Sequence, residues 1–550
     1  MAAAAELAVG AIGIAAAFKG AVDTALFIES FFDKGKREYG SVALAYHVQK
    51  TRLELWGDYC RAADSHSRIL REKPPHIKRL IIEILGRIEM LNGEVNALAN
   101  KYGITTPITE MPATDLDHNL QPGSGLAKEI AKKGSREPKP KLVVPWVIKA
   151  KSDFKEKINE IRTLITDLQD ITLQPRESQL LENGLEGPVL APVHHEDLLR
   201  IMSDLDTTIP LSLALSAHAK LLQSRILVNP GSATNISQRH LVPVKISSKS
   251  SNIYLFKRDD GQSLTVRIEW NKLSGGPDTQ QYIDRINSLG YILEQVSERA
   301  LRLPPCYGVY EDTGYEREHG VKRLGYVFGL PNVGSVSGRE GETYDSDILS
   351  HPPIALNDLI KQEGHIPLLG DRFRLAYTLA CAFSRFHAAG WLHKGFHSGS
   401  ILFFHKCGGK GIDVTEPFIT GFQYSRPQGA NSLSFSPLDN KILEYYYHPD
   451  ADKGFTRRLD LYSLGVVLLE IGRWGLFADR KKPFKTRKEW QEYMLDKGVQ
   501  DLGWRMGKEY QGVVKTLLDC DLPADDRTPH GFFAQLYLEK VMKPLISCSV

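Results

Sequence analysis

The sequence predicts a multidomain protein with an N-terminal all-α helical bundle and a C-terminal bilobal α+β domain. Three observations predict this division. Apolar residues recur at helical spacing in the N-terminal part, strand-like segments follow a cluster of turn-forming residues at 229–238, and helical patterns return from about residue 355. The 550-residue chain is long enough for several cores. We expect a bundle at 1–225, a linker at 226–245 and a two-lobed domain at 246–550.

The helical prediction for the N-terminal part depends on two apolar stripes. One follows Pro74-Pro75 and recurs at three- and four-residue steps, at Leu80, Ile81, Ile84, Leu85, Ile88, Leu91, Val95 and Leu98. The other lies within 151–169, at Phe154, Ile158, Ile161, Ile165 and Leu168. Each stripe must be buried against another element, so two stripes imply a bundle.

The first residues have an unusual composition, because Leu7–Phe18 is uncharged throughout. No basic residues precede this run, as they would in a signal peptide, and its length is below the roughly 20 residues that span a bilayer. The favoured interpretation is a buried helix of the bundle, and the alternative is a helix that enters a membrane only under some condition. The candidate membrane-helix residues are Leu7, Gly10, Ile12, Ile14, Ala17 and Phe18. Gly10, Gly13 and Ala17 allow close helix packing in either case.

Charge and cysteine content exclude several classes. The chain has 69 Lys and Arg against 66 Asp and Glu, a formal net charge of +3, which excludes a wholesale polybasic nucleic-acid binder. Its six cysteines form no CxxC pair, which fits a reducing compartment. The tetrad at 194–197 (HHED) lacks the helical spacing of zinc ligands, so we expect no metal. The basic segment 128–157 is interpreted as a solvated face, with an anionic-lipid patch as the alternative.

The N-terminal region resembles the fungal HeLo domain of prion-inhibition and propagation proteins. The resemblance is carried by 10–31 (GAIGIAAAFKGAVDTALFIESF), 52–57 (RLELWG) and 145–158 (PWVIKAKSDFKEKI). That family is associated with programmed cell death in heterokaryon incompatibility. The resemblance implies a helical bundle whose first helix can leave the bundle and insert into a membrane.

The C-terminal region opens with a hairpin signal, in which 252–257 and 264–270 flank the turn residues 259–261. Residues 250–548 resemble a protein kinase fold. The helix expected at 460–471 resembles the kinase helix that supports the catalytic loop, which gives Asp460 a structural role and suggests that it caps its helix. The helix expected at 375–392 resembles the one before that loop, and His448-Pro449-Asp450 resembles the end of the activation segment.

The kinase resemblance places residues without the required chemistry at four catalytic positions. In the loop that starts at His393, Gly395 replaces the catalytic Asp and Ser400 the metal-binding Asn. Gly421 replaces the magnesium-binding Asp, and Glu269 replaces the lysine that holds the phosphates. His397 is an alternative base, and Arg267 or Lys272 could replace the lysine in a shifted alignment. We therefore expect a pseudokinase with no cofactor, with residual ATP binding or kinase activity left open.

The two resemblances together imply a cytoplasmic cell-death effector in which the pseudokinase controls the bundle. We expect self-association, an upstream protein sensor, membrane lipids as partners on activation, and no nucleic acid. The alternative is a non-lytic scaffold that binds protein partners through both domains.

Overall fold

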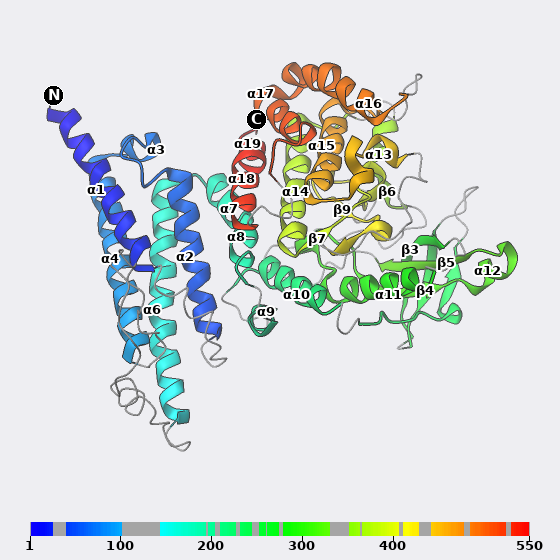
Figure 1. The fold of residues 1–550 in the computed structure, drawn as a ribbon, viewed down its shortest axis with the longest axis horizontal. Coiled ribbons are helices and arrows are strands. Elements are labelled where there is room, and N and C mark those ends of the chain that lie inside the picture. Colours follow the sequence, from blue (N-terminus) through cyan, green and yellow to red (C-terminus); the bar gives the residue numbers. More distant parts are fainter. Residues whose placement is uncertain are drawn as a thin grey trace, which may run out of the picture. The chain divides into compact units, whose positions relative to one another are not determined.

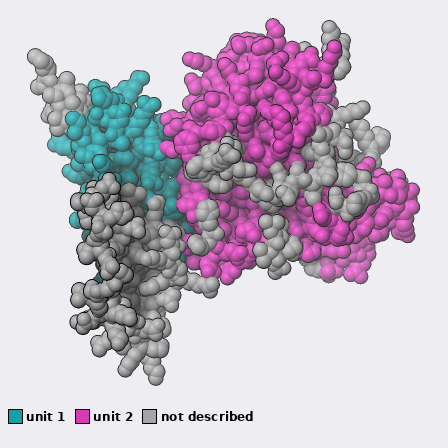
Figure 2. Space-filling model, viewed as in Figure 1, with its two compact units in different colours: residues 1–178 teal, residues 179–550 magenta. Residues whose placement is uncertain are grey.

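The computed structural model describes most of the chain, and its residues form two compact units, 1–178 and 179–550 (Figure 2). The described ranges are 2–25, 40–101, 143–193, 196–203, 209–226, 231–244, 252–259, 261–273, 279–329, 351–362, 366–405, 411–427, 442–477, 484–523 and 530–548. The tetrad residues 194 and 195 and the first half of the basic segment, 128–142, lie outside them.

The described part of the first unit is helical. Its helices are α1 (Ala2–Ala25), α2 (Gly40–Cys60), the short α3 (Arg68–Arg71), α4 (Pro75–Lys101) and α6 (Val143–Thr172). Helix α4 packs against α1 and α6, and α6 also packs against α2 (Figure 1). The apolar stripe predicted within α6 is buried at all five positions. In α4 the stripe is also buried, except at Leu80, which is exposed, and Leu98, which is half-buried.

Helix α1 packs within this unit through a face that includes Ile14, which is fully buried. Farther along α1, the ring of Phe18 lies edge-on to Trp56 of α2, with 5.9 Å between ring centroids. Any side chain at Gly57 would overlap that ring, so a glycine is required there. The Asn92 side-chain amide of α4 donates to the Ala21 carbonyl (2.9 Å). Both apolar and polar contacts therefore hold α1 in the unit.

The second unit begins with short helices that follow the bundle in the sequence. These are the end of α7 (Pro175–Asn183), α8 (Glu186–Leu190), α9 (Glu196–Ser203) and α10 (Leu211–Ile226). Helix α10 packs against α9 and against α11 (Thr279–Val296), and α8 packs against two helices from the C-terminal part of the chain, α14 (Leu369–Ala388) and α18 (His530–Tyr537). Residues after 178 thus fold with the C-terminal region.

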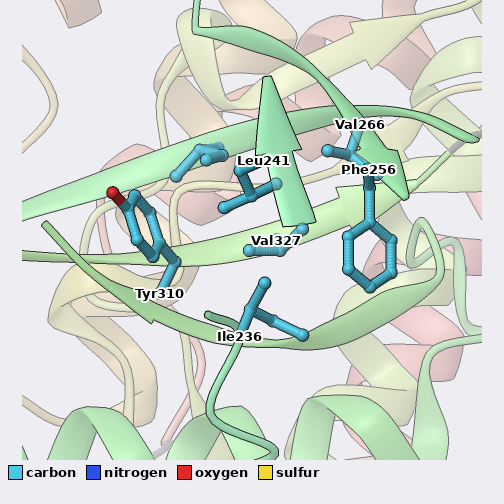
Figure 3. Close-up of a cluster of buried hydrophobic side chains, with 7 residues drawn as sticks. Ile236, Leu241, Phe256, Val266, Tyr310 and Val327 are labelled. Carbon is cyan, nitrogen blue, oxygen red and sulfur yellow. The ribbon is translucent and has the colours of Figure 1, made fainter. Parts of the chain in front are cut away.

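The second unit contains a five-stranded antiparallel sheet in the order β1-β2-β3-β5-β4. The strands are β1 (Leu241–Pro243), β2 (Ile253–Lys257), β3 (Ser263–Leu273), β4 (Cys306–Glu311) and β5 (Lys322–Gly329). The predicted hairpin is confirmed, because β2 and β3 pair on either side of the turn at Gly261. Ile236 joins the buried cluster formed by Leu241, Phe256, Val266, Ile268, Tyr310 and Val327 (Figure 3). Residues 231–244 of the predicted linker therefore pack as part of this unit.

The rest of the second unit is mainly helical, as the sequence predicts. Its helices are α13 (Leu356–Lys361), α14, α15 (Arg457–Arg473), α16 (Arg487–Tyr493), α17 (Gln500–Leu518), α18 and α19 (Lys543–Ser547). Five short strands accompany them: β6 (Ile354–Ala355), β7 (Trp391–Leu392), β8 (Ile401–Phe403), β9 (Phe418–Ile419) and β10 (Arg426–Pro427). The helix predicted at 375–392 begins earlier, at Leu369, and ends earlier, at Ala388, because Gly390 adopts a left-handed conformation and residues 391–392 form β7.

Candidate functional site

The carboxylate of Asp460 holds the backbone of the loop that begins at His393. Asp460 is fully buried in the first turn of α15, and it accepts hydrogen bonds from the backbone N–H groups of His393 and Lys394, both at 2.9 Å. The His387 Nε2 atom lies 3.2 Å from the same carboxylate. The N-cap of α15 is Thr456, so the prediction that Asp460 caps its own helix is wrong. Its bonds go to another segment instead.

The loop from 393 to 400 has no carboxylate at residue 395, where the kinase resemblance would require the catalytic Asp. Gly395 lies against the ring of Tyr424, and a Cβ there would come within 2.9 Å of it. The His397 Nδ1 atom lies 2.9 Å from the Gly395 carbonyl, which fixes the imidazole ring against its own loop. Burial lowers the pKa of His397 below its usual value, so the ring stays neutral near pH 7.

Ser400 and Gly421 are adjacent in the structure. The Ser400 hydroxyl donates to the His397 carbonyl (2.7 Å) and accepts from the His397 N–H (3.1 Å), so both of its hydrogen-bonding functions serve the loop. Gly421 has φ +87°, and a Cβ there would lie 2.8 Å from Ser400 Cβ. A side chain at Gly421 is thus disfavoured by backbone conformation and by space.

The Glu269 side chain of β3 contacts Gly421, which lies beside Ser400. Its Oε2 atom accepts a hydrogen bond from the Gly421 N–H (2.8 Å). Glu269 lines a mainly apolar pocket whose walls include Val266, Phe328 and Leu402. The structure thus brings Glu269 to Gly421 and Gly421 to Ser400, beside the loop that contains His393 and Gly395, and of these residues Glu269 lines the pocket.

His448 and Pro449 lie at the start of a short 3-10 turn, η11 (Pro449–Lys453). The buried His448 ring accepts a hydrogen bond at Nδ1 from the Asp450 N–H (3.0 Å) and lies edge-on to Tyr462 of α15. These residues fix one backbone turn against α15, and their contacts are structural.

The buried His393 predicts that the second unit loses stability in acid. Its Nε2 atom lies 2.8 Å from the Thr420 carbonyl, and burial lowers the pKa of His393 to about 4. An unfolded histidine takes up its proton near pH 6.5, so stability is lost as the pH falls from about 6.5 to about 4. We expect His393→Gln to flatten this part of the pH profile, measured by urea unfolding. An unchanged profile would contradict the assignment.

The candidate membrane-helix residues lie on different faces of α1. Ile14 and Phe18 are buried, whereas Ile12 is 58% exposed. Gly10 and Gly13 approach α4, where added Cβ atoms would lie 3.1 Å from Lys78 Cδ and 3.0 Å from Ile82 Cδ1. Ala17 is half-buried, and the Leu7 side chain lies outside the described part. Among the described residues, no helix is long and apolar enough to cross a membrane.

Sequence reasoning missed a buried ionic contact between the short helix α8 and α14. Glu186 of α8 is 1% exposed, and its Oε1 atom lies 3.1 Å from Arg385 Nε and accepts a hydrogen bond from the Ser212 hydroxyl (2.6 Å). Arg385 also donates to the side chain of Asn183 (3.0 Å) and to the carbonyl of Ala300 (2.9 Å). We call Asn183, Glu186 and Arg385 the α8–α14 clamp.

Close backbone approach accompanies the clamp. A Cβ at Gly187 would lie 2.5 Å from Ala534 Cβ of α18, so a larger residue does not fit there. The local signal for the clamp in the sequence is a glutamate beside two glycines in the apolar segment 184–190, which gives no indication of its partner.

The family model described as HeLo, prion-inhibition and propagation, matches residues 7–200. This match supports the N-terminal HeLo domain that the sequence predicts. None of the curated proteins matches the chain. The matched range covers the first unit from residue 7, within α1, and continues past 178. Its last residues therefore fold in the second unit and supply the Asn183 and Glu186 side chains of the α8–α14 clamp.

Proposed function

We propose that this protein is a regulated cell-death effector of the fungal incompatibility type, in which a catalytically inactive kinase-like domain controls a HeLo bundle that targets membranes. The main support is that the HeLo match runs through the α8–α14 clamp into the second unit. A structural change near α14 is then transmitted through α8 to the chain segment that leads into the bundle.

The proposal assigns no phosphoryl transfer to the second unit. Phosphoryl transfer needs carboxylates that hold magnesium and a group that receives the substrate's proton. Gly395 and Gly421 have no side chains for these tasks, and the acidic Glu269 occupies the position expected for the phosphate-holding lysine, with Arg267 lining the same pocket. Within the described residues, no group of acidic, His and Cys side chains is arranged to hold a metal ion.

We therefore predict that ATP with magnesium leaves the thermal unfolding midpoint of the full chain within about 1 °C, because a ligand stabilises only the state that binds it. Differential scanning fluorimetry with ATP, with and without magnesium, measures this. A shift of several degrees that needs magnesium would contradict the inactive assignment. A shift that persists without the metal would indicate nucleotide sensing instead.

The membrane role is tested with an exposed residue of α1. Because Ile12 is 58% exposed, Ile12→Glu should change the free energy of unfolding by no more than about 0.5 kcal/mol. A charged side chain at the bilayer centre costs about 3 kcal/mol, so the same change should abolish membrane permeabilisation. We expect dye leakage from anionic liposomes with residues 1–178, weaker leakage with the full chain, and none with 1–178 carrying Ile12→Glu.

Two controls make this test specific. Leu80→Glu places the same charge at an exposed apolar position of α4 and should leave leakage unchanged. Ile12→Leu keeps the apolar character of α1 and should also leak. Circular dichroism confirms that each variant of 1–178 remains helical. A non-lytic scaffold would cause no leakage with any of these proteins. If Leu80→Glu and Ile12→Glu reduce leakage equally, α1 has no specific role in permeabilisation.

A further inference from the structure

The second unit contains a second, mainly apolar pocket, which the function proposed above does not use. One of its walls is α10, which contributes Ser216 and Ala219. The opposite walls come from α11, from α14 and from β7, with Leu293, Phe386 and Trp391 among their residues. Four distant parts of the sequence, 216–219, 293–303, 385–391 and Phe422, thus line one pocket.

Helix α10 is fixed in place over this cavity. The Gln223 side-chain amide, oriented with its nitrogen toward the end of α14, donates to the carbonyls of Ala389 and Gly390, both at 2.9 Å. Also from α10, Lys220 Nζ donates to the Leu190 carbonyl (2.6 Å). The cavity is therefore bounded by hydrogen-bonded elements.

Two polar atoms at this cavity have no hydrogen-bond partner in the described part of the chain. They are the Ser216 hydroxyl and the Trp391 indole N–H. Ser216 is fully buried and Trp391 is 6% exposed. Leaving a buried donor unpaired is costly, so such groups in protein interiors are normally satisfied. Both residues line the same pocket, so a molecule bound there is a candidate partner for each group.

The chemistry of the walls limits what the ligand can be. The indole N–H is a donor only, and a hydroxyl can donate as well, so the ligand must supply an acceptor oxygen. The Arg385 guanidinium at the cavity is already paired with Glu186, Asn183 and the Ala300 carbonyl, so no further anion is needed to balance its charge. The remaining walls are apolar and favour an apolar body.

We infer that this cavity is a binding site for a small, neutral, mainly apolar molecule that carries a carbonyl oxygen. One carbonyl oxygen has two lone pairs and can accept from both Ser216 and Trp391. Because α10 forms one wall, the bound molecule stabilises α10 on α14. This inference is independent of the cell-death proposal, since it is tested by binding alone.

The test uses cyclohexanone as the probe and methylcyclohexane as a ring of similar size without the oxygen. In the full chain labelled with ¹⁵N-tryptophan, Trp391→Phe identifies the Trp391 indole signal by its loss. We expect cyclohexanone to shift that signal and to bind about tenfold more tightly than methylcyclohexane, which leaves the donors unpaired. Amide hydrogen exchange in α10 should slow when cyclohexanone is added.

Three variants distinguish binding at this pocket from non-specific binding of the probe elsewhere on the protein. Ser216→Ala should weaken cyclohexanone binding about fivefold, and Ala219→Leu should abolish binding by filling the space. The matched control is Ser297→Ala, which removes another buried hydroxyl without a partner in the described residues, but one outside the cavity lining. It should leave binding unchanged. Equal affinity for the two probes, no shift of the Trp391 signal, or equal effects of Ser216→Ala and Ser297→Ala would each overturn the inference.

Discussion

Replacing Arg385 by methionine is expected to lower the free energy of unfolding of the second unit by about 3–5 kcal/mol. The change removes the cation of the α8–α14 clamp but leaves the Glu186 carboxylate in a site where it is 1% exposed. An unpaired buried charge has lost its solvation without compensation, which is the reason for the large effect. Urea unfolding of the full chain, followed by the tryptophan fluorescence of this unit, measures the loss.

Two further variants test the cause. Arg374→Met removes an exposed arginine from the same helix, where it pairs with Asp371, and should change stability by no more than about 0.5 kcal/mol. The double variant Glu186→Gln with Arg385→Met should regain much of the loss, because the buried charge is removed together with its partner. If the double variant is as unstable as Arg385→Met, the stabilisation comes from the other contacts of Arg385. In the proposed function, the unstable variant should also permeabilise membranes more than the unaltered chain.

The second large effect is expected for Asp460→Ala, which should destabilise the second unit by about 3 kcal/mol or more. The change leaves the N–H groups of His393 and Lys394 buried without their acceptor, and each such group costs about 1–3 kcal/mol. Amide hydrogen exchange should rise first in 391–396, because this loop loses its attachment to α15. Thermal unfolding and exchange measured by mass spectrometry test both expectations.

The control for this variant is Asp450→Ala. Asp450 pairs with Lys453 in a largely exposed position, so its loss should cost less than about 1 kcal/mol. Asp460→Asn keeps one acceptor oxygen and should fall between the two. If Asp460→Ala and Asp450→Ala have equal effects, the buried carboxylate does not hold the loop.

Much of the local structure follows from the sequence, because its causes are local. The stripe at 154–168 predicts its own burial, since every third or fourth residue of a helix faces the same side. The turn at 259–261 predicts the β2–β3 hairpin for a similar reason. Helix ends were less predictable. The helix predicted to reach 392 ends at Ala388, because Gly390 adopts a left-handed conformation.

The features that were missed depend on distant contacts. A uniformly apolar run such as 7–18 shows no periodicity, so it cannot reveal that Ile14 is buried while Ile12 is exposed. The partner of Glu186 is Arg385, which is remote in the sequence, and no local pattern joins the two residues. The bond from Glu269 to the Gly421 N–H likewise depends on how β3 lies relative to β9 and its following turn.

The continuation of the HeLo match beyond residue 178 has a consequence for how this domain can be recombined with others. A segment cut after residue 200 would carry α8 away from α14 and α18, and would expose Val189 and Leu190, which are fully buried here. Joined to another protein, that segment should aggregate unless a new surface covers α8. A segment cut at 178 leaves α8 in place against α14 and α18, but it divides α7 (Pro175–Asn183). The residues that the family model matches and the residues that form the first compact unit therefore end at different positions, 200 and 178.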